Sequence, residues 1–230
     1  MIVYQDGQRC VHQLVLNQIR TNCYVLEMQG RALLIDPSDQ AGQIVALLQA
    51  RGLRLAAMLA THAHFDHVGA AGGIVDAGLA EGLHLHALDL PEYKRANSYA
   101  MLLQKRRIQQ APVVAFSADL HSLLQGFGLA VVHAGGHTPG SCSLQDLAQR
   151  FLITGDLALH HSIQPTLFDR RENTAQWAGF VDQVQQDFDA SAVLLPGHGA
   201  ASTVGQEVAH NRKWQYVRQQ RQQQGLQHAA

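Results

Sequence analysis

Three histidines and one aspartate lie within six residues, in the segment His62-Ala-His64-Phe-Asp66-His67. The segment directly follows an apolar run at residues 55–60. In extended backbone, side chains at positions i and i+2 point to the same side, so His62 and His64 can bind one metal ion. Asp66 and His67 continue around a turn and can face a second ion beside the first. Zinc, iron and manganese accept imidazole and carboxylate ligands, so this segment predicts a metal site.

Three later segments supply further candidate ligands, each at or just after the end of an apolar run. They are residues 135–141 with His137, residues 151–156 ending in Asp156, and residues 193–199 with His198. Strand ends of one sheet deliver side chains to a shared rim. The glycines before His137 are small enough to let the backbone come close to an ion. One such residue alone is more typical of a structural hydrogen bond, but the ordered set predicts a single site.

The elements that must position these ligands form two groups along the chain. In the first half, strands are predicted at residues 11–16, 23–28, 31–35, 55–60 and 83–88, with a hairpin turn at Gln29-Gly30. A helix is predicted to start with a cap at Ser38 or Asp39 and to end at Gly52. Its apolar residues at helical spacing are Ala41, Ile44, Val45 and Leu48. A second, short helix is predicted at residues 68–77.

The second half repeats this arrangement. Strands are predicted at residues 128–133, 142–147, 150–154 and 192–195, and helices at residues 173–189 and from 205 to about 223. The glutamine-rich stretch at residues 219–227 is expected to be a frayed helix end. Strands with interspersed helices in two halves favour an α/β fold of two packed sheets with helices outside. No low-complexity linker separates the halves, so we expect one domain over residues 1–230.

Composition favours a soluble enzyme with a small-molecule substrate. The chain has 230 residues, of which 47% are apolar, and a net charge of −1, so no basic surface invites nucleic acid. No apolar stretch is long enough to span a membrane, and no signal peptide precedes the first strand. The cysteines, Cys10, Cys23 and Cys142, are an odd and scattered set, so a reducing, cytoplasmic setting is expected. The sequence leaves the oligomeric state open.

The ordered ligand set, together with residues 22–26 and 33–37, resembles the metallo-β-lactamase superfamily of binuclear metallohydrolases. The tail at residues 202–207, with Asn211 after it, is similar to the short, single-domain type II glyoxalases, which are hydroxyacylglutathione hydrolases. The resemblance implies a four-layer αβ/βα sandwich, with two mixed β-sheets and helices outside. The sequence resemblance extends over nearly the whole chain.

The resemblance also implies a role for each ligand. His62, His64 and His137 would hold the first metal ion, Asp66, His67 and His198 would hold the second, and Asp156 would bridge the two. Two divalent ions, with zinc expected and iron or manganese as alternatives, can share a hydroxide that attacks an acyl carbon. Asp66 would also orient or deprotonate that nucleophile. The expected reaction is hydrolysis of a thioester such as S-lactoylglutathione.

The substrate is less well defined by the sequence. The chain departs from the short glyoxalase branch at Ser162-Ile163-Gln164-Pro165 and at Asn211-Arg212-Lys213-Trp214, two segments expected to touch the substrate. Basic and aromatic residues that can bind an acidic substrate are Tyr93, Lys94, Arg95, Arg212 and Lys213. The stretch at residues 89–110 can form a helical lid over the metals, although an ordinary solvated helix face is the favoured interpretation of its charges.

Three other functions fit parts of this pattern. A mononuclear iron site of His62, His137 and Asp156 would suit a persulfide dioxygenase, and lactone or β-lactam opening would use the same scaffold as the thioesterase. A metal-binding module without turnover is disfavoured, because a structural zinc needs only four ligands.

Several other polar residues carry weaker signals. Asp36 begins a turn near the rim and is a candidate to orient a ligand. His84 and His86 imitate a ligand pair inside a predicted strand, where a metal role is disfavoured. His160 and His161 follow Asp156 closely, and a surface position is favoured over contact with a metal ligand.

Overall fold

The computed structural model of the chain describes residues 1–161, 174–216 and 219. It forms two compact units, Met1–Leu123 and Leu124–Ala230. Each unit is built on its own β-sheet, and each contains part of the predicted ligand set. The prediction of one domain over the whole chain remains a prediction.

The first unit contains a mixed sheet whose seven described strands run in the order β1-β2-β3-β4-β5-β6-β7. Neighbours are antiparallel from β1 to β4 and parallel from β4 to β7. The strands are β1 (Ile2–Gln5), β2 (Arg9–Leu16), β3 (Thr21–Met28), β4 (Arg31–Ile35), β5 (Arg54–Leu59), β6 (Leu83–Leu85) and β7 (Val113–Ala115). The helical elements are α1 (Ala41–Ala50), α2 (Phe65–Val68), α3 (Ala71–Asp76), the 3₁₀ turn η1 (Ala87–Asp89), α4 (Leu90–Gln104) and α5 (Ala118–Gly126), which continues into the second unit.

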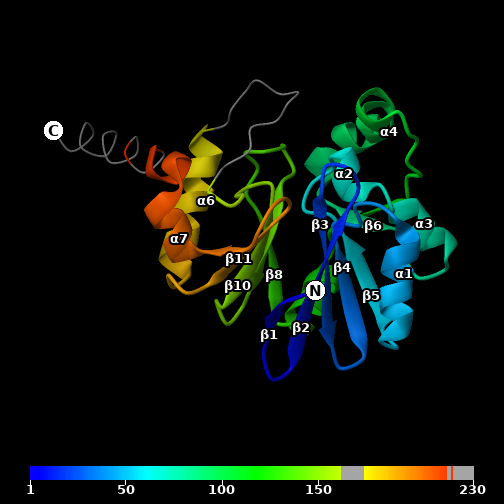
Figure 1. Cartoon of the computed structure of the whole chain (residues 1–230), viewed down its shortest axis with the longest axis horizontal. Helices are drawn as coiled ribbons and strands as arrows, with labels where there is room; N and C mark the ends of the chain where they lie inside the picture. Colours follow the sequence, from blue (N-terminus) through cyan, green and yellow to red (C-terminus); the bar gives the residue numbers. More distant parts are fainter. Residues whose placement is uncertain (162–173, 217–218, 220–230) are drawn as a thin grey trace. The chain divides into compact units, whose positions relative to one another are not determined.

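The core of the first unit lies between this sheet and its helices. Helix α1 buries Ile44 and Leu48, which lie one turn apart on one face, as the helical spacing predicts. These side chains join a cluster with strand residues such as Leu34 and Met58. Figure 1 shows α1 beside β4 and β5, with α3 next to it.

The second unit contains a mixed sheet whose five described strands run in the order β12-β11-β10-β9-β8. Only β10 and β11 are parallel. The elements are β8 (Leu129–His133), β9 (Cys142–Asp146), β10 (Phe151–Gly155), α6 (Thr174–Asp187), β11 (Val193–Pro196), β12 (Ser202–Thr203) and α7 (Val204–His210). Helices α6 and α7 lie along one side of β10 and β11 (Figure 1), where Trp177, Val181 and Val204 pack with Leu152 and Leu194.

Four predicted boundaries are wrong. Neither Ser38 nor Asp39 caps α1; the N-cap is Gln40 in left-handed conformation, because Asp39 pairs with Arg106 at 3.1 Å. The helix predicted at residues 68–77 starts only at Ala71, since the N–H of its N-cap, Ala70, donates to the Pro37 carbonyl at 2.9 Å. The strand predicted at residues 83–88 ends at Leu85, where η1 follows. The terminal helix is interrupted at Asn211, which has extended backbone; residues 217–218 and 220–227 lie outside the described residues.

Among the described helices, none combines the length and apolarity that a membrane span requires.

Candidate metal centre

The six-residue segment lies at the carboxyl end of β5, as the apolar run before it predicts. The chain bends at Thr61 and His62 after β5, and His64, with extended backbone at φ −64° and ψ 143°, is the N-cap of α2. The His67 N–H donates to the His64 carbonyl at 2.9 Å, closing the turn that starts α2. His64 therefore has the extended backbone that the sequence predicts, His62 lies in a bend, and Asp66 and His67 lie in the first turn of the helix.

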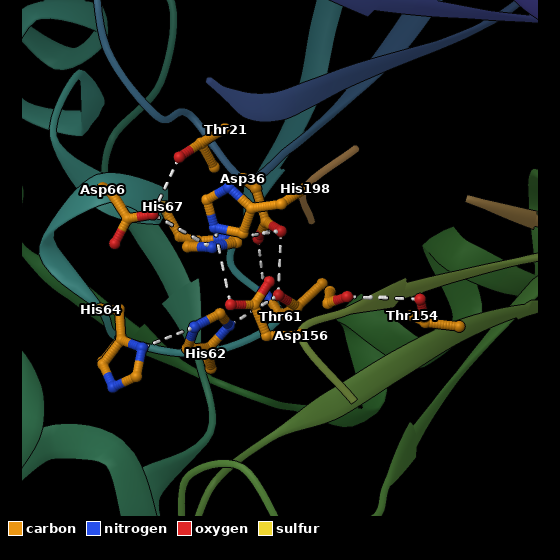
Figure 2. Close-up of polar contacts among 12 residues, drawn as sticks. Thr21, Asp36, Thr61, His62, His64, Asp66, His67, Thr154, Asp156 and His198 are labelled. Atoms are coloured by element: carbon orange, nitrogen blue, oxygen red, sulfur yellow. Dashed lines mark hydrogen bonds and ion pairs between the residues drawn. The ribbon is translucent and has the colours of Figure 1, made fainter. Parts of the chain in front are cut away.

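His62 and His64 have the spacing of two ligands on one ion. His62 Nε2 lies 3.1 Å from His64 Nδ1 (Figure 2). Two ligand nitrogens on one tetrahedral zinc lie about 3.3 Å apart, because each zinc–nitrogen bond is roughly 2.0–2.1 Å. His62 is 1% exposed, so its imidazole is held in this position by the surrounding protein.

Asp66 and His67 form a second pair with similar spacing. Asp66 Oδ2 lies 3.5 Å from His67 Nε2. The same carboxylate oxygen accepts a hydrogen bond from the Thr21 hydroxyl at 2.8 Å (Figure 2). Thr21 is fully buried at the start of β3 and fixes the direction of the carboxylate. The four residues thus divide into the two pairs that the sequence predicts.

Asp36 supports both the loop and the second pair. Its Oδ1 accepts the Thr61 backbone N–H at 2.6 Å, and its Oδ2 accepts the Thr61 hydroxyl at 2.9 Å. Oδ2 also lies 3.0 Å from His67 Nδ1, which leaves Nε2 as the ring nitrogen available to an ion. Asp36 has φ 52° and no exposed surface, so the chain holds it in a strained, fully buried position. Asp36 thus contacts a predicted ligand, as expected for an orienting group.

A second buried aspartate supports the loop from the other neighbouring strand. Asp89, in η1 after β6, accepts the Ala63 backbone N–H at 2.9 Å. Because β5 lies between β4 and β6 in the sheet, the loop after β5 is held by one aspartate from each side. Sequence reasoning missed Asp89 and Thr21, which carry no local pattern that marks them.

The second unit holds Asp156 between two histidines. Asp156 Oδ2 lies 3.6 Å from His137 Nε2 and 3.6 Å from His198 Nε2. Asp156 is 5% exposed, and it directly follows β10, as the apolar run predicts. One carboxylate oxygen thus lies close to two of the predicted imidazole ligands, and its bridging role stays a prediction.

The loops that carry these three residues depend on glycine. Gly155 has φ 51°, and its carbonyl accepts the Gly197 N–H at 2.8 Å, which joins the turns after β10 and β11. Gly136 has φ 91°, and a Cβ there would lie 2.5 Å from Trp177 Cδ1. The glycine before His137 therefore makes room for the Trp177 indole on α6, a use that differs from the predicted close approach of backbone to an ion.

The predicted substrate residues lie on two helical segments. Helix α4 confirms the helix expected within residues 89–110, and it exposes Lys94 and Arg95; Arg95 pairs with Glu92 at 2.8 Å. Tyr93 is buried, its hydroxyl donates to the Ala111 carbonyl at 3.0 Å, and burial raises its pKa to about 12. Arg212 and Lys213 are exposed in the helical turn after Asn211. Substrate contact and the lid stay predictions, and residues 162–165 lie outside the described residues.

Other weak candidates have ordinary structural environments. His86 accepts the Leu88 N–H and packs edge-on against Phe116, while burial lowers the pKa of His84. Cys142 is buried, with its thiol 3.2 Å from the Gly140 carbonyl, and Cys23 is buried in the core of the first unit.

Comparisons with known proteins agree with the fold described above. The sequence model of the Metallo-beta-lactamase superfamily matches residues 16–208. The hydroxyacylglutathione hydrolase GloC of Haemophilus influenzae is 27% identical over 201 residues, which cover 83% of this chain and 91% of that protein. A crystal structure of TTHA1623 in a di-iron-bound form is 32% identical, with a TM-score of 0.76, over 87% of this chain and 98% of that one. The B3 metallo-beta-lactamase BLEG-1 is 28% identical, with a TM-score of 0.72, over 87% of this chain and 97% of that one. The predicted fold class, an α/β protein with two mixed sheets and helices packed on them, is confirmed.

Proposed function

Because the chain belongs to the metallo-β-lactamase superfamily, a superfamily of metal-dependent hydrolases, we propose that it hydrolyses a thioester such as S-lactoylglutathione with two divalent ions bound. The thioester class is supported by the similarity to GloC, a hydroxyacylglutathione hydrolase, over most of both chains. Zinc and iron both suit the donor set, and the di-iron-bound form of TTHA1623 supports iron as an alternative to zinc.

The observation that carries this proposal is the division of the donors into pairs. His62 with His64 at 3.1 Å, and Asp66 with His67 at 3.5 Å, each fit one ion. Asp156, 3.6 Å from both His137 and His198, adds a carboxylate donor beside two imidazoles. Seven donors of imidazole and carboxylate exceed the four that one structural zinc takes, which favours two ions with open positions.

In this proposal, two divalent ions held by these donors would supply a bound water of lowered pKa and would polarise the thioester carbonyl. The protein residues hold and orient the reacting groups. Asp36 keeps the proton of His67 on Nδ1, and Thr21 donates to Asp66 Oδ2 and orients that carboxylate. Asp66 is then placed to orient the nucleophilic water and to accept its proton. No serine or cysteine nucleophile is required.

The test is a substrate panel on metal-stripped protein that is reloaded separately with zinc, iron or manganese. We expect hydrolysis of S-lactoylglutathione at two equivalents of metal, and an Asp66→Ala variant should turn over at least about 100-fold more slowly. A variant of an exposed residue on α4, Lys94→Ala, checks substrate binding, since it should change KM and leave metal content alone. A fully loaded protein that leaves every thioester intact would overturn the proposal.

A second candidate is opening of a β-lactam ring, supported by the 28% identity to BLEG-1 over most of both chains. The same panel separates the two functions when it includes a chromogenic β-lactam and a lactone. Oxygen consumption on glutathione persulfide, with iron alone bound, tests the dioxygenase alternative of the sequence.

A further inference from the structure

A second group of potential metal ligands lies entirely within the second unit and shares no residue with the proposed dinuclear centre. His160 and His161 follow the turn after β10, and Glu207 and His210 lie on α7. The ligand atoms of His160, His161 and Glu207 all lie within 4.8 Å of one another. Neither the proposed reaction nor its supporting contacts uses any of these side chains.

Glu207 is the fixed member of this group. It is fully buried, and its two oxygens accept the His161 backbone N–H at 3.1 and 2.9 Å. Asn211 Nδ2 donates to Oε2 at 2.7 Å, so two donors hold the carboxylate in one orientation. A carboxylate has about four acceptor positions, so Oε1 keeps capacity for another partner. Outer donors of this kind orient the carboxylates that bind metals.

Two imidazoles lie near the Glu207 carboxylate, and the imidazole of His210 lies next to one of them. His160 Nδ1 lies 3.7 Å from Glu207 Oε1. The His160 and His161 rings stack with centroids 3.9 Å apart, and the His210 ring centroid lies 5.4 Å from that of His161. His210 is three residues after Glu207, so both side chains project from the same face of α7. The three imidazoles are exposed and can adjust their rotamers, whereas the carboxylate is already in place.

His161 adopts a backbone conformation that serves this arrangement. Its φ of 54° is in the left-handed region, which few residues other than glycine adopt. This conformation directs the His161 N–H at Glu207 while its ring lies against His160.

We propose that His160, His161 and Glu207, with His210 as fourth ligand, bind one further divalent ion of the zinc type. Three imidazoles and one carboxylate are a tetrahedral zinc set, and four protein ligands leave no open position for a substrate. The ion would tie the segment after β10 to α7, which makes the site structural. The proposal does not depend on the thioesterase activity.

The experiment counts zinc equivalents in tag-free, metal-stripped protein by competition with a chromophoric chelator. Wild type should bind one equivalent more than a His160→Ala/His161→Gly double variant, whatever number the dinuclear centre takes. Glycine is chosen at position 161 because it adopts φ 54° without strain and keeps the N–H that Glu207 accepts. His121→Ala, which removes an exposed histidine on α5, is the matched control and should keep the wild-type count.

Two further measurements keep the proposal testable if the double variant is unstable. His160→Ala alone should weaken the additional equivalent by more than the roughly 10–100-fold that loss of an outer partner costs. In imidazole NMR spectra of wild type, the rings of His160, His161 and His210 should shift together as that equivalent binds. Equal zinc counts for wild type and the double variant, or the same loss in His121→Ala, would overturn the proposal.

Discussion

Replacement of Asp36 by asparagine tests how the second pair of ligands is oriented. Asp36 Oδ1 accepts the Thr61 N–H at 2.6 Å, so the asparagine oxygen should take that place and its NH₂ group should replace Oδ2. That NH₂ group would then face His67 Nδ1, which now lies 3.0 Å from Oδ2. Two donors cannot pair, so the His67 proton should move to Nε2, the nitrogen that must bind the ion.

The expected magnitude follows from these contacts. Loss of a partner that orients a metal-bound histidine costs about 10–100-fold in metal affinity, or about 1.4–2.8 kcal/mol. Asparagine tolerates the left-handed φ of 52° at this position, so the backbone should not oppose the change. Alanine is the poorer choice, because it would leave three buried donors without an acceptor. At about 1–3 kcal/mol each, these donors would remove much of a stability of about 5–15 kcal/mol.

The assay combines metal affinity with a direct measurement of the tautomer. Competition titration should show Asp36→Asn losing affinity for one of the two ions, and long-range ¹⁵N–¹H spectra should place the His67 proton on Nε2. Asp39→Asn is the control, since Asp39 pairs with Arg106 and has no contact with the predicted ligands among its hydrogen bonds and ion pairs described here. If Asp36→Asn binds both ions with wild-type affinity and His67 keeps its tautomer, the orienting role is wrong.

Three other predictions follow from contacts of the described residues. Gly136→Ala should lower the free energy of unfolding by about 1–3 kcal/mol in denaturant titrations, because its Cβ would lie 2.5 Å from the Trp177 indole. Gly179→Ala, with open space in the interior of α6, should instead raise it by about 0.5–1 kcal/mol. Thr21→Val should weaken one metal equivalent about 10–100-fold while Thr21→Ser preserves it, since only the hydroxyl contacts the second-pair carboxylate. Burial lowers the pKa of His84 from its usual 6.5, so its contribution to stability is present above pH 6.5 and is lost as pH falls through the folded-state pKa. In metal-free protein, His84→Gln should therefore reduce the dependence of the unfolding free energy on pH in this range.

The ligand pairs could be predicted because their signal is local. His62 and His64 are two residues apart just before a helix, and Asp66 and His67 lie in its first turn. The hairpin at Gln29 and Gly30 could also be predicted from local sequence, and both residues have the positive φ that a two-residue turn requires. In each case, neighbouring residues determine the geometry.

The errors arose where distant residues decide the local structure. Asp39 is a reasonable helix cap by type, but Arg106 takes its carboxylate from 67 residues away. The helix predicted to start at residue 68 starts later, because the Ala70 N–H donates a hydrogen bond to the Pro37 carbonyl. Thr21 reaches Asp66 across 45 residues, and no pattern around either residue indicates that contact. Local sequence therefore predicts ligands and strands better than it predicts the groups that orient them.

Two buried aspartates, Asp36 and Asp89, hold the loop after β5, and their positions follow from the order of strands in the sheet. Strands β4 and β6 flank β5, and the chain after each flanking strand places one carboxylate against the loop after β5. Asp36 holds the backbone before His62, and Asp89 holds the backbone between His62 and His64. Both donors are backbone N–H groups, so these contacts hold the backbone in place and do not depend on the side chains at positions 62 and 64. The two carboxylates thus hold the backbone around the first ligand pair, and the six-residue segment supplies the spacing and the chemistry of that pair.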